Sequence, residues 1–261
     1  MTLAVDIGNT NVVIGVSLGE GWPYVWRLPT ISGADEAHLF YPTHIGDHLL
    51  EADVRLNDIE RVVISSVVPH LTGPFEDLIQ QFLGIKPIVL SREVYEQLPL
   101  QIVNKDQIGA DLVANALAAN LLFKRNVIVV DFGTALTFTT IDKEGAILGV
   151  SIAPGLKTAM GVLHQKTAQL PEVPLGLPDS ALGRNTVHAI QSGVLIGYVG
   201  LVRHLLASIR AEVGDQYVAV ATGGLSSILH PLQDDFFAVD PHLTLHGLRL
   251  IGELYQRRGG T

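Results

Sequence analysis

Residues 5–11 read Val-Asp-Ile-Gly-Asn-Thr-Asn, and residues 130–136 read Val-Asp-Phe-Gly-Thr-Ala-Leu. Each stretch follows one apolar run and precedes another, which predicts two strands joined by a tight turn. We expect such a hairpin to turn backbone N–H groups outward, where they can hold phosphate oxygens. The Asp at its edge can hold a divalent cation. Two such stretches in one chain therefore predict a duplicated fold that closes on one nucleotide.

Either stretch alone is also explained as an ordinary hairpin in which Asp and Asn serve the turn. The repetition makes the nucleotide site the stronger interpretation. A third candidate contact is Thr222-Gly223-Gly224, where glycines after an expected strand would let the backbone approach a ligand closely. This signal is weak by itself and gains weight only beside the two hairpins.

The composition bounds the class of protein. In 261 residues the chain is 48% apolar and 16% charged, which is ample for a sizeable core. The net charge of −9, without clusters of Lys and Arg, argues against nucleic acid as a partner. The chain has no Cys, which excludes disulfides, thiolate zinc sites and Cys nucleophiles and fits a cytoplasmic location.

The order of expected elements repeats. The pattern predicts strand, strand, strand, helix, strand, helix in each half, with half-domains at residues 1–115 and 116–261 and no flexible linker. The first half is expected to hold strands at 3–5, 12–16, 24–28, 62–68 and 87–90, and helices at 36–51, 72–82 and 110–123. The second is expected to hold strands at 127–130, 137–141, 146–152 and 218–221, and helices at 156–169, 185–213, after 224 and at 246–255.

No targeting or membrane segment is expected. The chain starts directly in a predicted strand, without the basic and apolar regions of a secretory signal. The longest apolar stretch, roughly 193–202, is interrupted by Arg203 and falls short of the ~20 residues that a membrane span needs. We therefore interpret it as a buried helix and expect no contact with a membrane.

Asp111 is the candidate for proton transfer. It stands in Gly109-Ala110-Asp111 at the start of an expected helix, where an acidic residue is also favoured simply by the helix dipole. The functional interpretation is a general base that takes the proton from a substrate hydroxyl during phosphoryl transfer. The ten His residues form no metal-binding spacing, and Ser65-Ser66 lacks the elbow of a serine hydrolase.

The chain resembles a type III pantothenate kinase, of the actin/hexokinase/Hsp70 ATPase superfamily. The resemblance runs almost end to end and rests on short motifs in a specific order and spacing. They are Asp6-Ile-Gly-Asn-Thr-Asn11, Ser65-Ser-Val-Val-Pro69, Gly109-Ala-Asp111, Asp131-Phe-Gly-Thr134, Pro154-Gly155, Thr167-Ala-Gln-Leu-Pro171, Gly183-Arg-Asn-Thr186, Ala189-Ile-Gln-Ser-Gly193, Ala221-Thr-Gly-Gly224 and Asp240-Pro-His-Leu-Thr-Leu-His-Gly-Leu248.

The resemblance implies a fold class and an activity. It implies an α/β protein of two ribonuclease-H-like (actin-like ATPase) half-domains with a nucleotide cleft between them. The implied reaction is ATP-dependent phosphorylation of the primary hydroxyl of pantothenate to 4'-phosphopantothenate, the first step toward coenzyme A. The implied cofactors are ATP, Mg²⁺ and a monovalent cation, K⁺ or NH₄⁺. A homodimer with the substrate pocket near its interface is also implied.

Roles for individual residues follow from the same resemblance. Asp111 would accept the hydroxyl proton, Asp6 would hold Mg²⁺ and Asp131 would hold the monovalent cation. ATP would be bound by Asp6, Ile7, Gly8, Asn9, Thr10, Asn11, Val12, Val13, Thr134, Gly223 and Gly224. The acyl substrate would be bound by Ile102, Gly109, Ala110, Asp111, Leu112 and Thr186.

The departures from the family pattern cluster in the expected substrate region. Leu112 stands where the family has Arg, Ile102 where it has Tyr, and Lys105 where it has Pro. Leu136 replaces a usual Thr, and Val150 a usual Gly. An Arg would meet the pantothenate carboxylate, and its loss would weaken binding about ten- to a hundredfold. Lys105 does not offer the same bidentate fork.

Three outcomes are therefore open from the sequence. The protein is a weaker pantothenate kinase, a kinase for a related hydroxylated acid or amide, or a diverged paralogue that binds nucleotide as a non-catalytic regulator. The retained Asp111 favours an enzyme.

Overall fold

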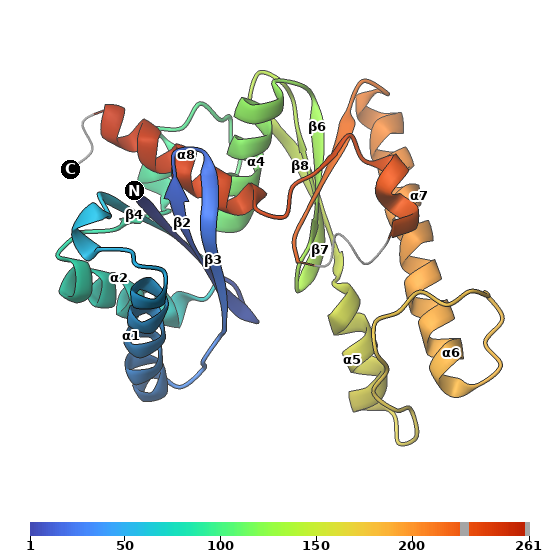
Figure 1. Cartoon of the computed structure of the whole chain (residues 1–261). Coiled ribbons are helices and arrows are strands. Elements are labelled where there is room, and N and C mark those ends of the chain that lie inside the picture. The colour runs from blue at the N-terminus through green and yellow to red at the C-terminus, as the bar shows by residue number, and fades with distance from the viewer. Residues whose placement is uncertain (225–229, 259–261) are drawn as a thin grey trace. The chain divides into compact units, whose positions relative to one another are not determined.

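The computed structural model describes residues 1–224 and 230–258 and contains two five-stranded sheets (Figure 1). The first sheet has the order β3-β2-β1-β4-β5 and the second the order β10-β9-β6-β7-β8. The strands of the first are β1 (Thr2–Ile7), β2 (Asn11–Leu18), β3 (Gly21–Pro29), β4 (Arg61–Ser66) and β5 (Ile88–Val89). Those of the second are β6 (Val127–Phe132), β7 (Ala135–Ile141), β8 (Ile147–Pro154), β9 (Val218–Thr222) and β10 (Ala238–Val239).

The two sheets have the same topology. In each, the first strand pairs antiparallel with the second and parallel with the fourth, and the second pairs antiparallel with the third. The fifth strand pairs parallel with the fourth in both. The duplication expected from the two Asp-Gly stretches is therefore confirmed, and so is the α/β class.

Helices complete each unit. They are α1 (Ala34–Glu51), α2 (Pro69–Leu83), α3 (Arg92–Tyr95), α4 (Ala110–Phe123), α5 (Leu156–Lys166), α6 (Thr186–Gln191), α7 (Gly197–Val213) and α8 (Leu243–Arg257). Short 3₁₀ turns lie at Leu56–Asp58 and His230–Asp235. The helix expected directly after residue 224 lies outside the described residues.

Contacts divide the chain into two compact units. One is Met1–Ala118 with Thr244–Thr261, and the other is Ala119–Leu243. The C-terminal helix α8 thus groups with the first sheet. The half-domains drawn from the sequence at 1–115 and 116–261 remain a prediction.

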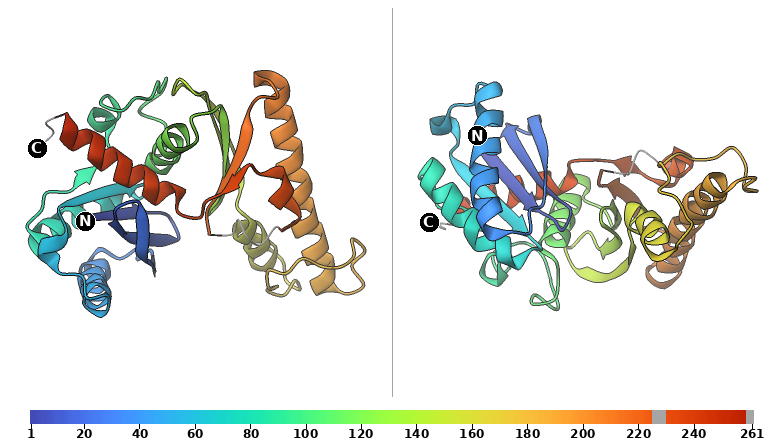
Figure 2. Two further views of the ribbon diagram at one scale, coloured as in Figure 1. Left: turned by 45° about the horizontal axis from the view of Figure 1, so that its top comes forward. Right: turned by 90° about the horizontal axis from the view of Figure 1, so that it is seen from below.

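The first unit has helices on both faces of its sheet. Leu3, Val5 and Ile7 of β1 point into an apolar core shared with α1 and α2, because alternate residues of a strand face one side. The opposite face meets α8, where a side chain at Gly15 would collide with Leu245. Figures 1 and 2 show α1 and α2 together on one side of this sheet.

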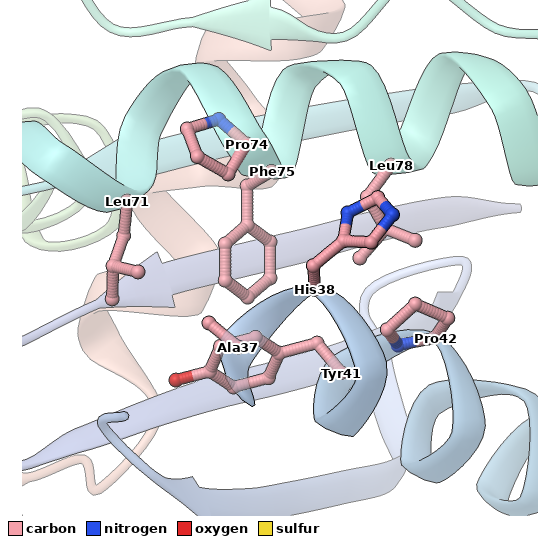
Figure 3. A pocket seen from close by; sticks show the side chains of 8 residues that line it. All are labelled: Ala37, His38, Tyr41, Pro42, Leu71, Pro74, Phe75 and Leu78. Carbon is pink, nitrogen blue, oxygen red and sulfur yellow. The ribbon is translucent and has the colours of Figure 1, made fainter. Parts of the chain in front are cut away.

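The contact between α1 and α2 is tight and aromatic (Figure 3). The rings of Tyr41 and Phe75 lie 4.5 Å apart, and only a cavity of about 10 Å³ remains among the surrounding side chains. Pro42 and Pro74 line this cavity too. The Tyr41 hydroxyl accepts a hydrogen bond from Ile31 N (2.9 Å) and donates to Pro29 O (3.1 Å), which fixes the end of β3 to α1.

The second unit has its core between the sheet and α7 (Figure 1). Val130 and Phe132 of β6 share this core with Val202 and Leu206 of α7. The helix expected at 185–213 is continuous but contains a π-helical turn at Ser192–Ile196, between α6 and α7. In both views of Figure 2, α5 lies near the α6 end of α7.

This long helix is less buried than the sequence suggested. The segment Thr186–Val213 is long and apolar enough to cross a membrane by length and composition, and only 33% of its most apolar window is buried. Its Val202 and Leu206 pack in the core of the second unit. Arg203 Nε forms an ion pair with Asp235 Oδ2 (2.9 Å). The expectation of a buried helix thus holds for one side only, because the described residues leave an apolar side of this segment uncovered.

Some boundaries also differ from expectation. The strand expected at 62–68 ends at Ser66, and α2 begins at Pro69, because a helix does not need the amide hydrogen of its first residue. The four-residue α3 gave no periodic signal. Helix α5 ends at Lys166, where the Thr167 hydroxyl donates to Leu163 O (2.8 Å) and the chain turns extended.

Candidate active site

The first hairpin carries Asp6 on the penultimate residue of β1. Asp6 pairs in register with Val13 on β2 and with Ser65 on β4. Its side chain points away from the core made by Val5 and Ile7, since neighbouring residues alternate between faces. The turn is closed by Gly8 N, which donates to Asn11 O (3.0 Å).

The second hairpin carries Asp131 at the equivalent position of β6. Asp131 pairs with Thr137 on β7 and with Thr222 on β9, and it too points away from the core. Gly133 N donates to Ala135 O (3.1 Å) to close the turn. The amides of both turn glycines are therefore used inside the hairpins, and a ligand would have to meet other N–H groups.

The two turns differ by one residue. Ile7 pairs with Val12, which leaves four residues in the first turn, whereas Phe132 pairs with Leu136, which leaves three in the second. The third strand of each unit shows which turn residues correspond. It ends in a Pro, and the residue after this Pro donates its N–H to a carbonyl oxygen of the turn. Thr30 N donates to Thr10 O (3.1 Å), and Gly155 N donates to Thr134 O (2.9 Å). Thr10 is thus the counterpart of Thr134, and Asn9 is the extra residue.

Two Thr residues that the sequence did not single out support these turns. The Thr30 hydroxyl donates to Gly8 O (2.6 Å), and the Thr158 hydroxyl donates to Thr134 O (2.8 Å). Each lies just beyond the third strand of its unit. Their role depends on which strands pair, so spacing along the chain gave no signal for it.

The third loop meets the second hairpin. Gly223 has φ +90°, and a β-carbon there would lie 2.5 Å from Asp131 Oδ1 and 2.8 Å from the Phe132 backbone. Only Gly allows both the conformation and the close approach. The structure thus brings Thr222, Gly223 and Asp131 together. Gly224, the next residue, lies in a turn and is exposed.

Asp111 lies in the first turn of α4, within the first unit. Its Oδ1 accepts a hydrogen bond from Leu112 N (2.8 Å), and a side chain at Gly109 would collide with the same oxygen. Burial raises the pKa of Asp111, although the hydrogen bonds from the Leu112 and Asp111 amides act in the opposite direction. A carboxyl group with a raised pKa is a stronger base, as proton abstraction requires.

Helix α8 fixes the helix that carries Asp111. Gly247 of α8 packs on the backbone of Ala114, which leaves no room for a side chain there. The Thr244 hydroxyl donates to Asn115 Oδ1 (2.8 Å), and Asn115 is fully buried. The last helix of the chain thus contacts both the start of α4 and, through Leu245, the first sheet.

Two of the positions that depart from the family pattern, Leu112 and Ile102, are apolar and buried. Leu112 is 8% exposed and Ile102 9%, and Ala110 beside them is 5% exposed. Lys105 lies 3.6 Å from Glu96 in an ion pair. Tyr95 is buried near Asp111, and burial together with the Asp111 charge raises its pKa to about 12, so its phenol keeps its proton.

Thr186 belongs to the second unit and is the first residue of α6. Asn185 caps this helix by accepting a hydrogen bond from His188 N (2.9 Å), and Gly183 packs directly on Ala189. Thr186 itself is exposed at this helix start.

The groups available for a cation are oxygens. Among residues 1–224 and 230–258, no group of three or more His, Asp or Glu side chains could hold a metal ion. Single carboxylates with hydroxyl neighbours remain, at Asp6 and at Asp131. Such a set suits hard cations that also take phosphate or water oxygens, and Mg²⁺ is bound in this way by one or two carboxylates.

A duplicated α/β unit with an Asp-bearing hairpin in each copy defines the actin-like ATPase fold. Solved structures agree on the fold. MreB5 of Spiroplasma citri bound to ADP superposes with a TM-score of 0.54 at 12% identity over 99% of this chain and 98% of that one. The activator of 2-hydroxyisocaproyl-CoA dehydratase from Clostridium difficile, with bound ADPNP, gives 0.54 at 13% identity over 100% and 97%.

The chain belongs to the type III pantothenate kinase family. The model of that family matches residues 2–208. A type III pantothenate kinase of Thermomicrobium roseum is 40% identical over 260 residues, which is 100% of both chains. The resemblance stated from the short motifs is thereby confirmed.

Proposed function

We propose that the protein transfers the γ-phosphoryl group of ATP to the primary hydroxyl of pantothenate and forms 4'-phosphopantothenate, the first step of coenzyme A biosynthesis. The observation that carries this proposal is family membership over the whole chain, joined to an Asp-bearing hairpin in each duplicated unit. The alternative of a diverged, non-catalytic regulator finds no support among the comparisons.

Asp111 is the general base in this proposal. It accepts the proton of the substrate hydroxyl as that oxygen attacks the γ-phosphorus and ADP leaves with the bridging oxygen, and its raised pKa suits it to hold the proton. Gly109 places no side chain against Oδ1, where a β-carbon would collide with this oxygen. Leu112, Ile102 and Ala110 give this part of the site an apolar wall, with Thr186 as a further substrate contact.

The two hairpins handle the phosphates. Residues 6–13, Thr134, Gly223 and Gly224 bind ATP. Asp6 holds Mg²⁺, and Asp131 holds a monovalent cation, K⁺ or NH₄⁺. When bound, the cations offset the negative charge of the phosphates. The hydroxyl residues that pair in register with these carboxylates, Ser65 with Asp6 and Thr137 and Thr222 with Asp131, support these assignments.

A homodimer completes the proposal. Edge strand β8 exposes Val150 and Ile152, which alternate along the strand and so lie on one face, and it also exposes Leu148 at a register shift. The α6–α7 segment has an uncovered apolar side in the same unit. A second copy that covers the α6–α7 surface would lie near Thr186 of α6, the substrate contact assigned to this unit, as expected for a homodimer with its substrate pocket near the interface. The reaction is placed in the cytoplasm, where ATP and pantothenate meet.

The test is ATP consumption by the purified protein with pantothenate, with pantoate or with a pantothenamide, each with and without K⁺. Formation of 4'-phosphopantothenate, identified by mass spectrometry, is the expected result. Turnover with pantoate or the amide but not with pantothenate would assign a different substrate. No turnover with any of them, while ATP still binds, would reject the kinase in favour of a regulator.

A further inference from the structure

Three polar side chains form a row across the middle of the second sheet. Thr137 on β7, Asp131 on β6 and Thr222 on β9 pair directly with one another in the strand register. Directly paired residues project from the same face of a sheet, about 4.5–5.5 Å apart at Cβ in an antiparallel pair. The alternate residues Val130 and Phe132 lie in the core beneath, so this row occupies the opposite face.

Both hydroxyls of the row are buried without a hydrogen-bond partner. Thr137 is 8% exposed and Thr222 1%, and the Oγ1 atom of each lacks a partner among the described residues. Buried hydroxyl groups are nearly always hydrogen-bonded. Two unpartnered hydroxyls on either side of the Asp131 carboxylate therefore indicate a ligand that binds to all three groups.

The surroundings specify the chemistry of that species. Gly223 approaches Asp131 Oδ1 so closely that no β-carbon fits, and Gly133 also leaves the carboxylate without a covering side chain. The side chains of the row thus offer a carboxylate and two hydroxyl oxygens. An all-oxygen set with a single negative charge suits a hard cation of low charge.

The first unit provides an internal comparison. Asp6 is paired with Val13 on one side and Ser65 on the other, and only Ser65 brings a hydroxyl, which is fully buried and also unpartnered. The Asp6 row therefore brings one hydroxyl, where the Asp131 row brings two. Mg²⁺ dehydrates reluctantly and keeps several waters, which suits the poorer site. A monovalent cation gives up its water to protein oxygens, as K⁺ does in channel filters, which suits the richer one.

We propose that Thr137 and Thr222 bind the monovalent cation beside Asp131 through their hydroxyl oxygens and thereby set the cation preference of this site. This inference rests on the proposed kinase function for its purpose. Its test does not, because cation binding to the protein without substrates is measured directly.

The experiment follows the thermal unfolding midpoint of the full chain as KCl replaces tetramethylammonium chloride at constant ionic strength. A cation that binds only the folded protein raises this midpoint in proportion to its occupancy. Thr137→Val and Thr222→Val keep the side-chain shape and remove one hydroxyl each. We expect each to raise the K⁺ concentration at half-maximal stabilisation about tenfold or more, and Thr222→Ser to restore it.

Thr139→Val is the matched control. Thr139 lies two residues along β7 on the same face, is 1% exposed, and its hydroxyl is not among the unpartnered atoms. It should lower the midpoint and leave the K⁺ dependence unchanged. Without K⁺, the Thr137 and Thr222 variants should match or exceed the wild-type midpoint, since an unpartnered buried hydroxyl is unfavourable.

Three results would overturn the inference. One is a wild-type midpoint that K⁺ and tetramethylammonium affect equally. The second is an unchanged K⁺ dependence in both Val variants. The third is a midpoint that drops in these variants as much as in Thr139→Val, which would mark the hydroxyls as ordinary structural groups. Each can occur while pantothenate is still phosphorylated, so failure here is distinct from failure of the proposed function.

Discussion

Gly223 and Asp131 are in direct contact: a β-carbon on Gly223 would lie 2.5 Å from Asp131 Oδ1. The residue that follows β9 therefore packs directly against the carboxylate near the end of β6. These strands also pair in parallel, with Asp131 opposite Thr222. Asp131, the Thr222 hydroxyl and Gly223 therefore depend on one another, and a change in any of them should affect the other two.

Gly223→Ala should therefore reduce both function and stability. The variant places a side chain against Asp131 and the Phe132 backbone, at a φ of +90° that Ala disfavours. We expect the free energy of unfolding to fall by about 1–3 kcal/mol and ATP binding to weaken. Calorimetric ATP titration and denaturant unfolding measure the two effects. Gly161→Ala, in α5 with nothing within 4 Å of the new carbon, is the control and should keep wild-type ATP affinity.

Asp111→Asn should remove the base and keep the local geometry. The Asn oxygen can still accept from Leu112 N, so the helix start is retained. We expect turnover with pantothenate to fall about 10²–10⁴-fold and ATP affinity to stay nearly constant. Unaltered turnover in this variant would remove Asp111 from the mechanism.

The same residue gives a pH prediction with a definite sign. Burial raises the pKa of Asp111, so between its usual and its raised pKa the folded state binds more protons than the unfolded state. Its contribution to stability is present below the usual pKa and is lost as pH rises through the raised one. Wild-type stability relative to Asp111→Asn should thus decrease over that window, and kcat/KM should fall on acidification through the raised pKa. Parallel stability profiles of the two proteins would contradict this.

Leu112→Arg tests the departure from the family pattern. Leu112 is 8% exposed, so an Arg there buries much of its charge and should lower the unfolding midpoint. It also supplies the cation that family members have, and KM for pantothenate should fall about tenfold or more. Added pantothenate should then recover part of the lost midpoint. Leu112→Met is the matched control of similar volume, for which we expect an unchanged KM.

Ile152→Asp should weaken the proposed dimer. Ile152 is 69% exposed on edge strand β8 and lies on the same face as Val150. A charge at this place would be buried without a partner in a second copy. Sedimentation velocity should show monomer for this variant and dimer for the wild type. Leu39→Asp, 73% exposed on α1 in the other unit, should remain a dimer.

Tyr41→Phe should destabilise the first unit. The Tyr41 hydroxyl joins Ile31 N to Pro29 O, and both backbone groups lose their partner in the variant. We expect the free energy of unfolding to fall by about 1–3 kcal/mol, measured by urea titration. Tyr24→Phe, at an exposed ring on β3, should change it by less than about 0.5 kcal/mol.

Much of the fold could be predicted from local hydrophobic patterns in the sequence. The apolar runs around Asp6 and Asp131 predicted two hairpins, and both hairpins occupy the same place in equal sheets. Periodicity works here because strand and helix positions alternate between core and surface at fixed intervals. It failed at α3, which is too short to repeat, and at Ser192–Ile196, where a π turn leaves the helical pattern intact.

What the sequence by itself determined is the duplication, the family and the carboxylates at residues 6, 111 and 131, because each is written in residues close together along the chain. Only the tertiary structure decided which groups stand beside those carboxylates. Thr222 is 91 residues from Asp131, and Gly247 is 133 residues from Ala114, yet each pair is in contact or in register. Strand pairing and helix packing bring such distant segments together. Neither requires a fixed separation along the chain, so the contacts could not be predicted from the sequence.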